Sequence, residues 1–117
     1  MSAAMTIPTR LSQLSESRRT LVRLLQTINF GYIEDLDIRG GEPVLAPAPN
    51  VVIEVKLDTD DNGRSESTLA DYELRSEVVR LMGQLDIVRD GWIQRIDVRF
   101  GVPRRALIER PIRGARR

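Results

Sequence analysis

The stretch GYIEDLDIRGGEP at residues 31–43 returns as GWIQRIDVRFGVP at residues 91–103. Six of the thirteen positions are identical, and three more exchange a side chain for a similar one. In both copies apolar and polar residues alternate, which is typical of a half-buried strand. Gly40-Gly41 and Phe100-Gly101 follow at the places where hairpin turns need positive φ angles. The repeat therefore predicts two β-hairpins of similar design.

A helix is predicted before each hairpin. Over residues 9–29, apolar side chains recur at spacings of three and four, which is typical of an amphipathic helix. A second stripe covers about residues 68–86, where Thr68 and Asp71 fit a capping box. Aligning the two stripes by their Val-Arg-Leu motifs requires three extra residues before the second hairpin.

The predicted order is helix, strand, strand, repeated once. The returning strand of the first copy must bulge or break at the prolines of an insertion, residues 46–50, before it resumes over residues 51–57. An isolated hairpin is only marginally stable, but two can join into one sheet. We expect one α+β domain, a two-layer sandwich with a duplicated unit, a four-stranded antiparallel sheet and both helices on one face. The repeats span about 9–57 and 68–109, and a basic tail spans 110–117.

The predicted core follows the apolar stripe of each element. In the first strand, Tyr32, Leu36 and Ile38 are assigned to the core face, and Ile33 to the opposite face. The full predicted core is Leu21, Leu25, Ile28, Tyr32, Leu36, Ile38, Ile53, Val55, Val78, Leu81, Leu85, Trp92, Ile96 and Val98.

The segments 28–33 and 36–44 resemble the helix-plus-hairpin of the small bacterial YezD-like proteins: an aromatic residue, a glycine, a β-branched alternation, a glycine turn and an apolar return. The resemblance covers about residues 21–45 and, more loosely, 78–109. The chain departs from that pattern in its proline-rich insertion and in carrying two copies. The resemblance implies the helix-plus-hairpin fold and assigns no site.

The composition excludes several kinds of chemistry. The 117 residues contain no cysteine and no histidine, which excludes disulfides, thiol nucleophiles, Cys/His zinc sites and imidazole acid–base catalysis. Carboxylate or lysine chemistry stays open, but we expect a protein that is not an enzyme and holds no cofactor. No apolar run approaches the roughly 20 residues that span a bilayer, and no signal-peptide pattern is present. We expect a cytoplasmic protein.

Asp37-x-Arg39 recurs as Asp97-x-Arg99 on the predicted polar face of the sheet. The four side chains could form a patch that binds a partner or an anion. The simpler interpretation is cross-strand ion pairs on a solvated face, each worth a few tenths of a kcal/mol.

The loop after residue 57 opens like a calcium-binding loop, with Asp58, Asp60 and Asn62 at the first, third and fifth positions. The twelfth position, where a bidentate glutamate is needed, is Leu69. A polar turn between strand and helix explains the same residues without a metal.

The C-terminal segment is rich in arginine. It could bind the phosphates of RNA or DNA, contact an acidic protein, or serve only to keep the chain soluble. Tyr32 and Trp92 are assigned to the core, so no base-stacking surface is predicted. The arginines are Arg104, Arg105, Arg110, Arg113, Arg116 and Arg117.

Two functions are therefore predicted from different classes. The favoured one is a protein–protein interaction module, an adaptor or accessory subunit that self-associates or joins a larger assembly. The alternative is a nucleic-acid-binding accessory protein that uses the arginine-rich arm.

Overall fold

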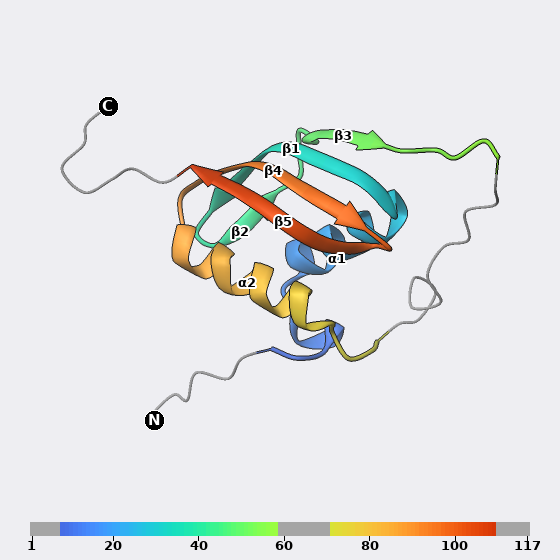
Figure 1. Cartoon of the computed structure of the whole chain (residues 1–117). Coiled ribbons are helices and arrows are strands. Elements are labelled where there is room, and N and C mark those ends of the chain that lie inside the picture. Colours follow the sequence, from blue (N-terminus) through green and yellow to red (C-terminus); the bar gives the residue numbers. More distant parts are fainter. Residues whose placement is uncertain (1–7, 59–70, 110–117) are drawn as a thin grey trace, which may run out of the picture.

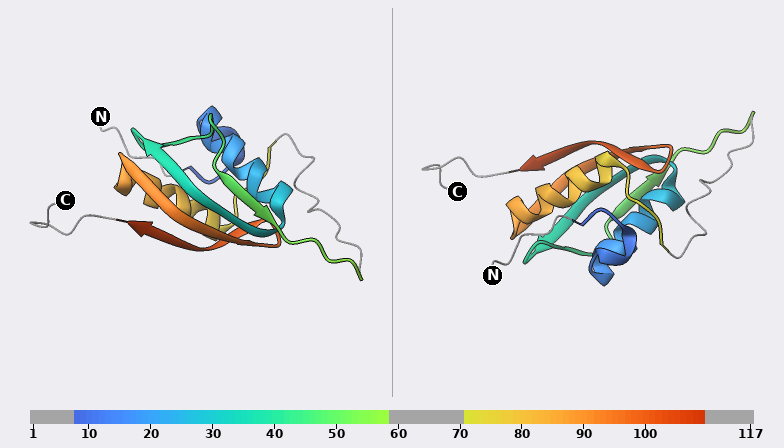
Figure 2. Two further views of the ribbon diagram at one scale, coloured as in Figure 1. Left: turned by 90° about the horizontal axis from the view of Figure 1, so that it is seen from above. Right: turned by 90° about the horizontal axis from the view of Figure 1, so that it is seen from below.

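The computed structural model describes residues 8–58 and 71–109. Figure 1 shows two helices under one antiparallel sheet, so the chain has an α+β fold as predicted. In the view from below, both helices lie in front of the strands (Figure 2). The elements are η1 (Leu11–Gln13), α1 (Glu16–Ile28), β1 (Phe30–Arg39), β2 (Glu42–Val44), β3 (Asn50–Ile53), α2 (Ser76–Val88), β4 (Gly91–Arg99) and β5 (Val102–Glu109). No helix in the described ranges is long and apolar enough to cross a membrane.

The sheet has five strands rather than the predicted four. The strand order is β2-β1-β4-β5. β3 also pairs with β1, along a part of β1 that β2 does not cover. The prediction that the prolines would bulge or break the returning strand is confirmed, because β2 ends at Val44 and β3 begins at Asn50. A proline has no N–H to donate to a ladder, so the segment 45–49 leaves the sheet. β3 ends at Ile53, four residues earlier than predicted.

Both predicted hairpin turns are confirmed. Arg39 pairs with Glu42 around Gly40-Gly41, and Arg99 pairs with Val102 around Phe100-Gly101. All four turn residues have positive φ angles, between 56° and 79°. α1 and α2 each contain 13 residues, and α2 starts sixty residues after α1, the same offset as the strands. The three extra residues that the alignment required are therefore absent.

Both helices begin later than predicted. Residues 9–15 form the short helix η1 and an extended link, and Ser15 caps α1 by accepting a hydrogen bond from the backbone of Arg18. Asp71 does not cap α2, which starts at Ser76; its carboxylate accepts hydrogen bonds from the backbone of Ser12 and from Arg10. Thr68 lies outside the described residues. Both helices begin late because of a long-range contact: the backbone of residues 9–11 is hydrogen-bonded to that of residues 72–74.

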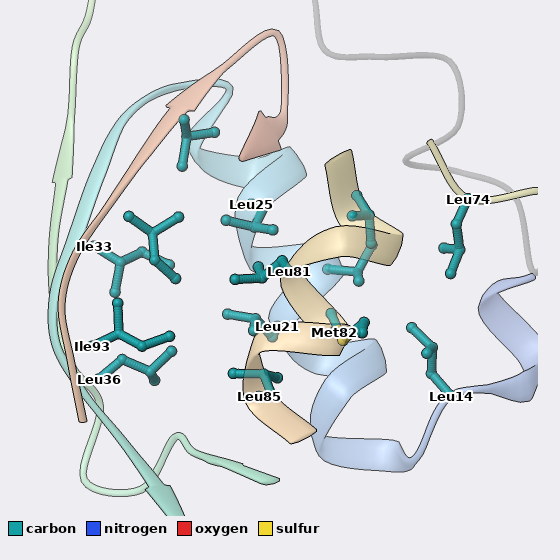
Figure 3. Close-up of a cluster of buried hydrophobic side chains, with 14 of the residues drawn as sticks. Leu14, Leu21, Leu25, Ile33, Leu36, Leu74, Leu81, Met82, Leu85 and Ile93 are labelled. Carbon is teal, nitrogen blue, oxygen red and sulfur yellow. The ribbon is translucent and has the colours of Figure 1, made fainter. Parts of the chain in front are cut away.

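The hydrophobic core lies between the helices and the sheet. Figure 3 shows the side chains of Ile33, Leu36 and Ile93 pointing from the sheet toward leucines of α1 and α2. Ten of the fourteen predicted core residues are buried: Leu21, Leu25, Ile28, Leu36, Ile38, Val78, Leu81, Leu85, Ile96 and Val98. The prediction is wrong for Tyr32, which is only partly buried, and for Ile53, Val55 and Trp92, which are exposed.

A local backbone irregularity explains why Tyr32 and Ile33 lie on the faces opposite to those predicted. Asp35 has a φ of 59°, so the strict alternation of β1 is interrupted there. Ile33 and Leu36, three residues apart, therefore both face the core, and Tyr32 faces away from it. The ladder between β4 and β5 is also shifted between Ile93 and Arg95. Ile53 and Val55 are exposed because β3 ends at the margin of the sheet.

Candidate functional site

The sheet face that the helices leave uncovered, here called the outer face, carries a cluster around Asp97. One carboxylate oxygen accepts a hydrogen bond from Nε of Arg95 at 2.7 Å, and the other accepts one from Nε of Arg105 at 3.0 Å. Partial burial would raise the pKa of Asp97, but the hydrogen bonds and charges of the two arginines lower it overall. The guanidinium of Arg95 also stacks on Tyr32, 3.8 Å from the ring centre. The cluster thus joins two arginines to one aspartate and keeps one net positive charge.

The repeated Asp-x-Arg motif does not form one patch. Tyr32 lies opposite Asp97 in the β1–β4 ladder, and Trp92 lies opposite Asp37. Asp37 is exposed and makes no ion pair within the described residues. Arg39 and Arg99 are exposed beside the two hairpin turns, at opposite ends of the antiparallel pair. The structure therefore brings Asp97 together with Arg105, not with the other motif residues.

Two neighbouring arginines of β5 contact acidic residues on opposite faces of the sheet. Arg105 binds Asp97 on the outer face, whereas Arg104 approaches Glu77 of α2, with an N–O distance of 3.5 Å. The β4–β5 ladder is shifted between Asp97 and Val98, and this irregularity falls at Arg104. β5 therefore presents one arginine toward the helices and one toward the outer face.

A groove of about 500 Å³ runs between α2 and β5. Its lining combines apolar side chains, including Leu81, Ile87 and Ile108, with charged ones, including Arg80 and Arg104. The side chain of Ile87 is 59% exposed at this groove. Gly83 also lines the groove, and a Cβ added to it would meet no atom within 4 Å. No contact within the part of the chain that the structure describes therefore requires a glycine at position 83.

The two edges of the sheet are built differently. On one edge, β2 and β3 are short, and three prolines, at positions 43, 47 and 49, lie in or between them. Short strands and prolines prevent a further strand from pairing there. On the other edge, β5 runs for eight residues and within the described part of the chain pairs with β4 alone. Figure 2 shows β5, in red, along the border of the sheet in both views. We call the free side of β5 together with the groove the β5 edge site.

A buried polar cluster lies where α1 meets the first hairpin and the end of α2. The side chain of Arg18 is 10% exposed and donates to the backbone oxygen of Gly41 from Nη2 at 2.7 Å and from Nε at 3.2 Å. Nη2 also donates to Asp86 at 2.6 Å. The hydroxyls of Ser15 and Ser17 donate to Glu42. This cluster joins α1, the first hairpin and the end of α2, so its role is structural.

Glu42 belongs to the same cluster. Burial would raise its pKa, but the hydrogen bonds from the two serines and the charge of Arg18 lower it overall. Glu42 therefore stabilises the fold in its charged form.

Several predicted site residues lie outside the described residues. These are Asp60 and Asn62 of the calcium-like loop, and Arg110, Arg113, Arg116 and Arg117 of the tail. Asp58 is described and exposed. Within the described ranges, no group of three or more acidic side chains is placed to hold a metal ion.

The β5 edge site is not among the sites predicted from the sequence. Ile87 lies just beyond the predicted helix of residues 68–86, and Leu107 lies near the end of the second repeat, outside the predicted core. Both residues could have been noticed as large apolar side chains outside the predicted core stripes. Leu107 is 41% exposed.

Comparison with known proteins adds no relative. No family model matches the chain. No curated protein and no solved structure shows a significant match either.

Proposed function

We propose that this chain is a non-enzymatic protein–protein interaction module, an adaptor or accessory subunit, and that it binds through the β5 edge site. The observation that carries the proposal is the contrast between the two edges of the sheet. An unprotected edge strand can pair with a strand of another protein, and natural proteins usually block such edges. This chain blocks one edge with prolines and short strands, and among residues 8–58 and 71–109 no strand pairs with the other edge.

The groove supports the same proposal. Strand addition supplies backbone hydrogen bonds, and an adjacent apolar groove supplies specificity for side chains. Ile87 and Leu107 are exposed apolar groups on the two sides of β5. Burying both would remove apolar area from water, at about 25 cal/mol per Å².

We also propose that the two halves arose by duplication of a helix-plus-hairpin unit of the YezD-like kind. The equal lengths of α1 and α2, their sixty-residue offset and the matched turns support this origin. The proline-rich segment then distinguishes the halves, since Leu45 and Val51 pack against the core on the side of α1. The second half has no such insertion, and its groove is accessible.

The proposal is tested by placing a charge in the groove. Ile87→Arg should abolish recovery of the partner when the tagged protein is purified from the source cells after nuclease treatment. Thr27→Arg is the matched control, because Thr27 is exposed on α1 at the position sixty residues earlier. Thermal unfolding should show both variants folded. Equal recovery with both variants would refute the proposed surface.

The nucleic-acid alternative rests on the arginine-rich arm. On the outer face, Asp97 pairs with both Arg95 and Arg105, so it balances only one of their two positive charges. Deleting residues 110–117 removes four arginines. If the arm binds nucleic acid, the deletion should flatten the plot of log affinity against log salt by up to about 3–4 units. If the intact protein binds no RNA or DNA probe at physiological salt, the alternative is excluded.

A further inference from the structure

We infer that the partner at the β5 edge site is a second copy of this chain, with β5 pairing antiparallel to β5 around a twofold axis at Leu107. The inference rests on the proposed function and specifies its partner. It is carried by the order of charges along β5, which makes the strand complementary to itself.

The faces of β5 restrict its register with a second copy. Arg105, Leu107 and Glu109 share the outer face, because they pair with outer-face positions of β4 or alternate with those that do. Ala106 and Ile108 face the helix layer and pack against the core. In an antiparallel pair, directly opposed residues share a face. The twofold axis must therefore place outer-face residues of one copy opposite outer-face residues of the other, and helix-layer residues opposite helix-layer residues.

One register matches the charges. With Leu107 opposite its own copy, Glu109 lies opposite Arg105 of the second copy, and the symmetry repeats this pair. Ile108 then lies opposite Ala106 of the second copy in the helix layer. A twofold axis at Arg105 would instead oppose two arginines. An axis at Ala106 would oppose Ile108 to Arg104, and an axis at Ile108 would oppose Leu107 to Glu109. Only the Leu107 register of these four pairs opposite charges and opposes apolar residues to apolar residues.

The helix layer fits the same symmetry. A twofold axis perpendicular to the sheet at β5 places the α2 helices of the two copies on the same side of the joined sheet. The two grooves then face each other, and Ile87 of each copy can be buried between the helices. Gly83 leaves room for a close approach of the second α2, which accounts for a glycine in the middle of a helix, where it is unfavourable relative to alanine.

Single cysteines test the register directly, because the chain has no cysteine of its own. Directly opposed residues have Cβ atoms about 4.5–5.5 Å apart, close to disulfide distance. Under mild oxidation, Leu107→Cys should yield mostly covalent dimer on a non-reducing gel. Ile53→Cys is the matched control, since Ile53 is a similarly exposed apolar residue on the opposite edge; it should remain mostly monomeric.

A charge exchange tests the ion pairs. Glu109→Arg and Arg105→Glu each oppose like charges twice in the homodimer, and each should weaken association at least about tenfold. A mixture of the two variants restores opposite charges at both positions, so it should form a heterodimer. Sedimentation equilibrium measures all three samples, and circular dichroism verifies that each variant is folded.

The outcomes separate the inference from the proposed function. A wild-type chain that stays monomeric at high concentration, or a mixture that fails to associate, overturns the inference. If Ile87→Arg still abolishes recovery of a different protein, the proposed function stands with another partner. If neither self-association nor partner recovery depends on the β5 edge site, both fall.

Discussion

Replacing Arg18 with methionine should destabilise the fold by about 2–3 kcal/mol. Methionine keeps most of the apolar stem of the side chain and removes the guanidinium. The backbone oxygen of Gly41 then loses both of its hydrogen bonds from Arg18. Gly41 is buried in the turn of the first hairpin, so water cannot readily replace these donors.

The magnitude follows from comparing two interactions of the same side chain. A hydrogen bond from a charged donor to a buried acceptor contributes about 1.5–3 kcal/mol. The ion pair with Asp86 contributes less, because the Asp86 side chain is 65% exposed and exposed pairs are worth about 0–1 kcal/mol. The contact with the carbonyl of Gly41 should therefore dominate.

The assay is urea unfolding of three chains, followed by circular dichroism. Arg18→Met should lower the free energy of unfolding by about 2–3 kcal/mol, and Asp86→Ala by less than about 1 kcal/mol. The slope against urea should stay constant if both variants unfold from the same native state. A loss for Asp86→Ala as large as that for Arg18→Met would refute the reasoning.

Three further predictions concern stability. Ile33→Ala should cost about 2–5 kcal/mol, whereas Tyr32→Ala should cost less because Tyr32 lies on the outer face; equal losses in urea unfolding would contradict the assigned faces. Gly83→Ala, made in the Glu109→Arg background to weaken the proposed self-association, should raise the free energy of unfolding by about 0.5–1 kcal/mol, and a loss would show that the position is crowded. The pKa of Glu42 is lowered in the folded chain, so its contribution is present above the unfolded pKa and declines as the pH falls through the folded value. Glu42→Gln should therefore lose less stability than the wild type between roughly pH 5 and pH 2.

The elements that are determined by residues close together in the sequence were predictable. Gly40-Gly41 and Phe100-Gly101 indicated the hairpins because positive φ angles leave few other choices of residue. The helix stripes indicated which faces of α1 and α2 are buried, with Leu21, Leu25, Leu81 and Leu85 all in the core.

Long-range contacts and backbone irregularities were not predictable in the same way. Asp71 satisfied a local capping pattern, but its partner is Ser12, fifty-nine residues away. The positive φ of Asp35 moves Ile33 into the core and Tyr32 out of it. A signal for this irregularity is visible in retrospect, because two consecutive polar residues interrupt the alternation at the same place in each repeat, Glu34-Asp35 and Gln94-Arg95.

The candidate site was harder to predict than the fold. The residues that the sequence singled out, the repeated Asp-x-Arg motifs, are separated in space or paired internally. The β5 edge site depends on which strand is outermost, and strand order comes from the pairing of β1 with β4. A pattern within one segment carries no information about that order.

The central pairing of β1 with β4 also makes each half of the chain dependent on the other. Their ladder joins residues about sixty positions apart, and the core is shared by helices from both halves. A cut between residues 58 and 71 would leave two fragments, each with one helix and one hairpin but without a complete sheet. Such fragments are unsuited to folding separately, yet they carry complementary apolar faces and a long complementary strand. The chain is thus a candidate for fragment complementation, in which two inactive pieces reassemble only when their fusion partners bring them together.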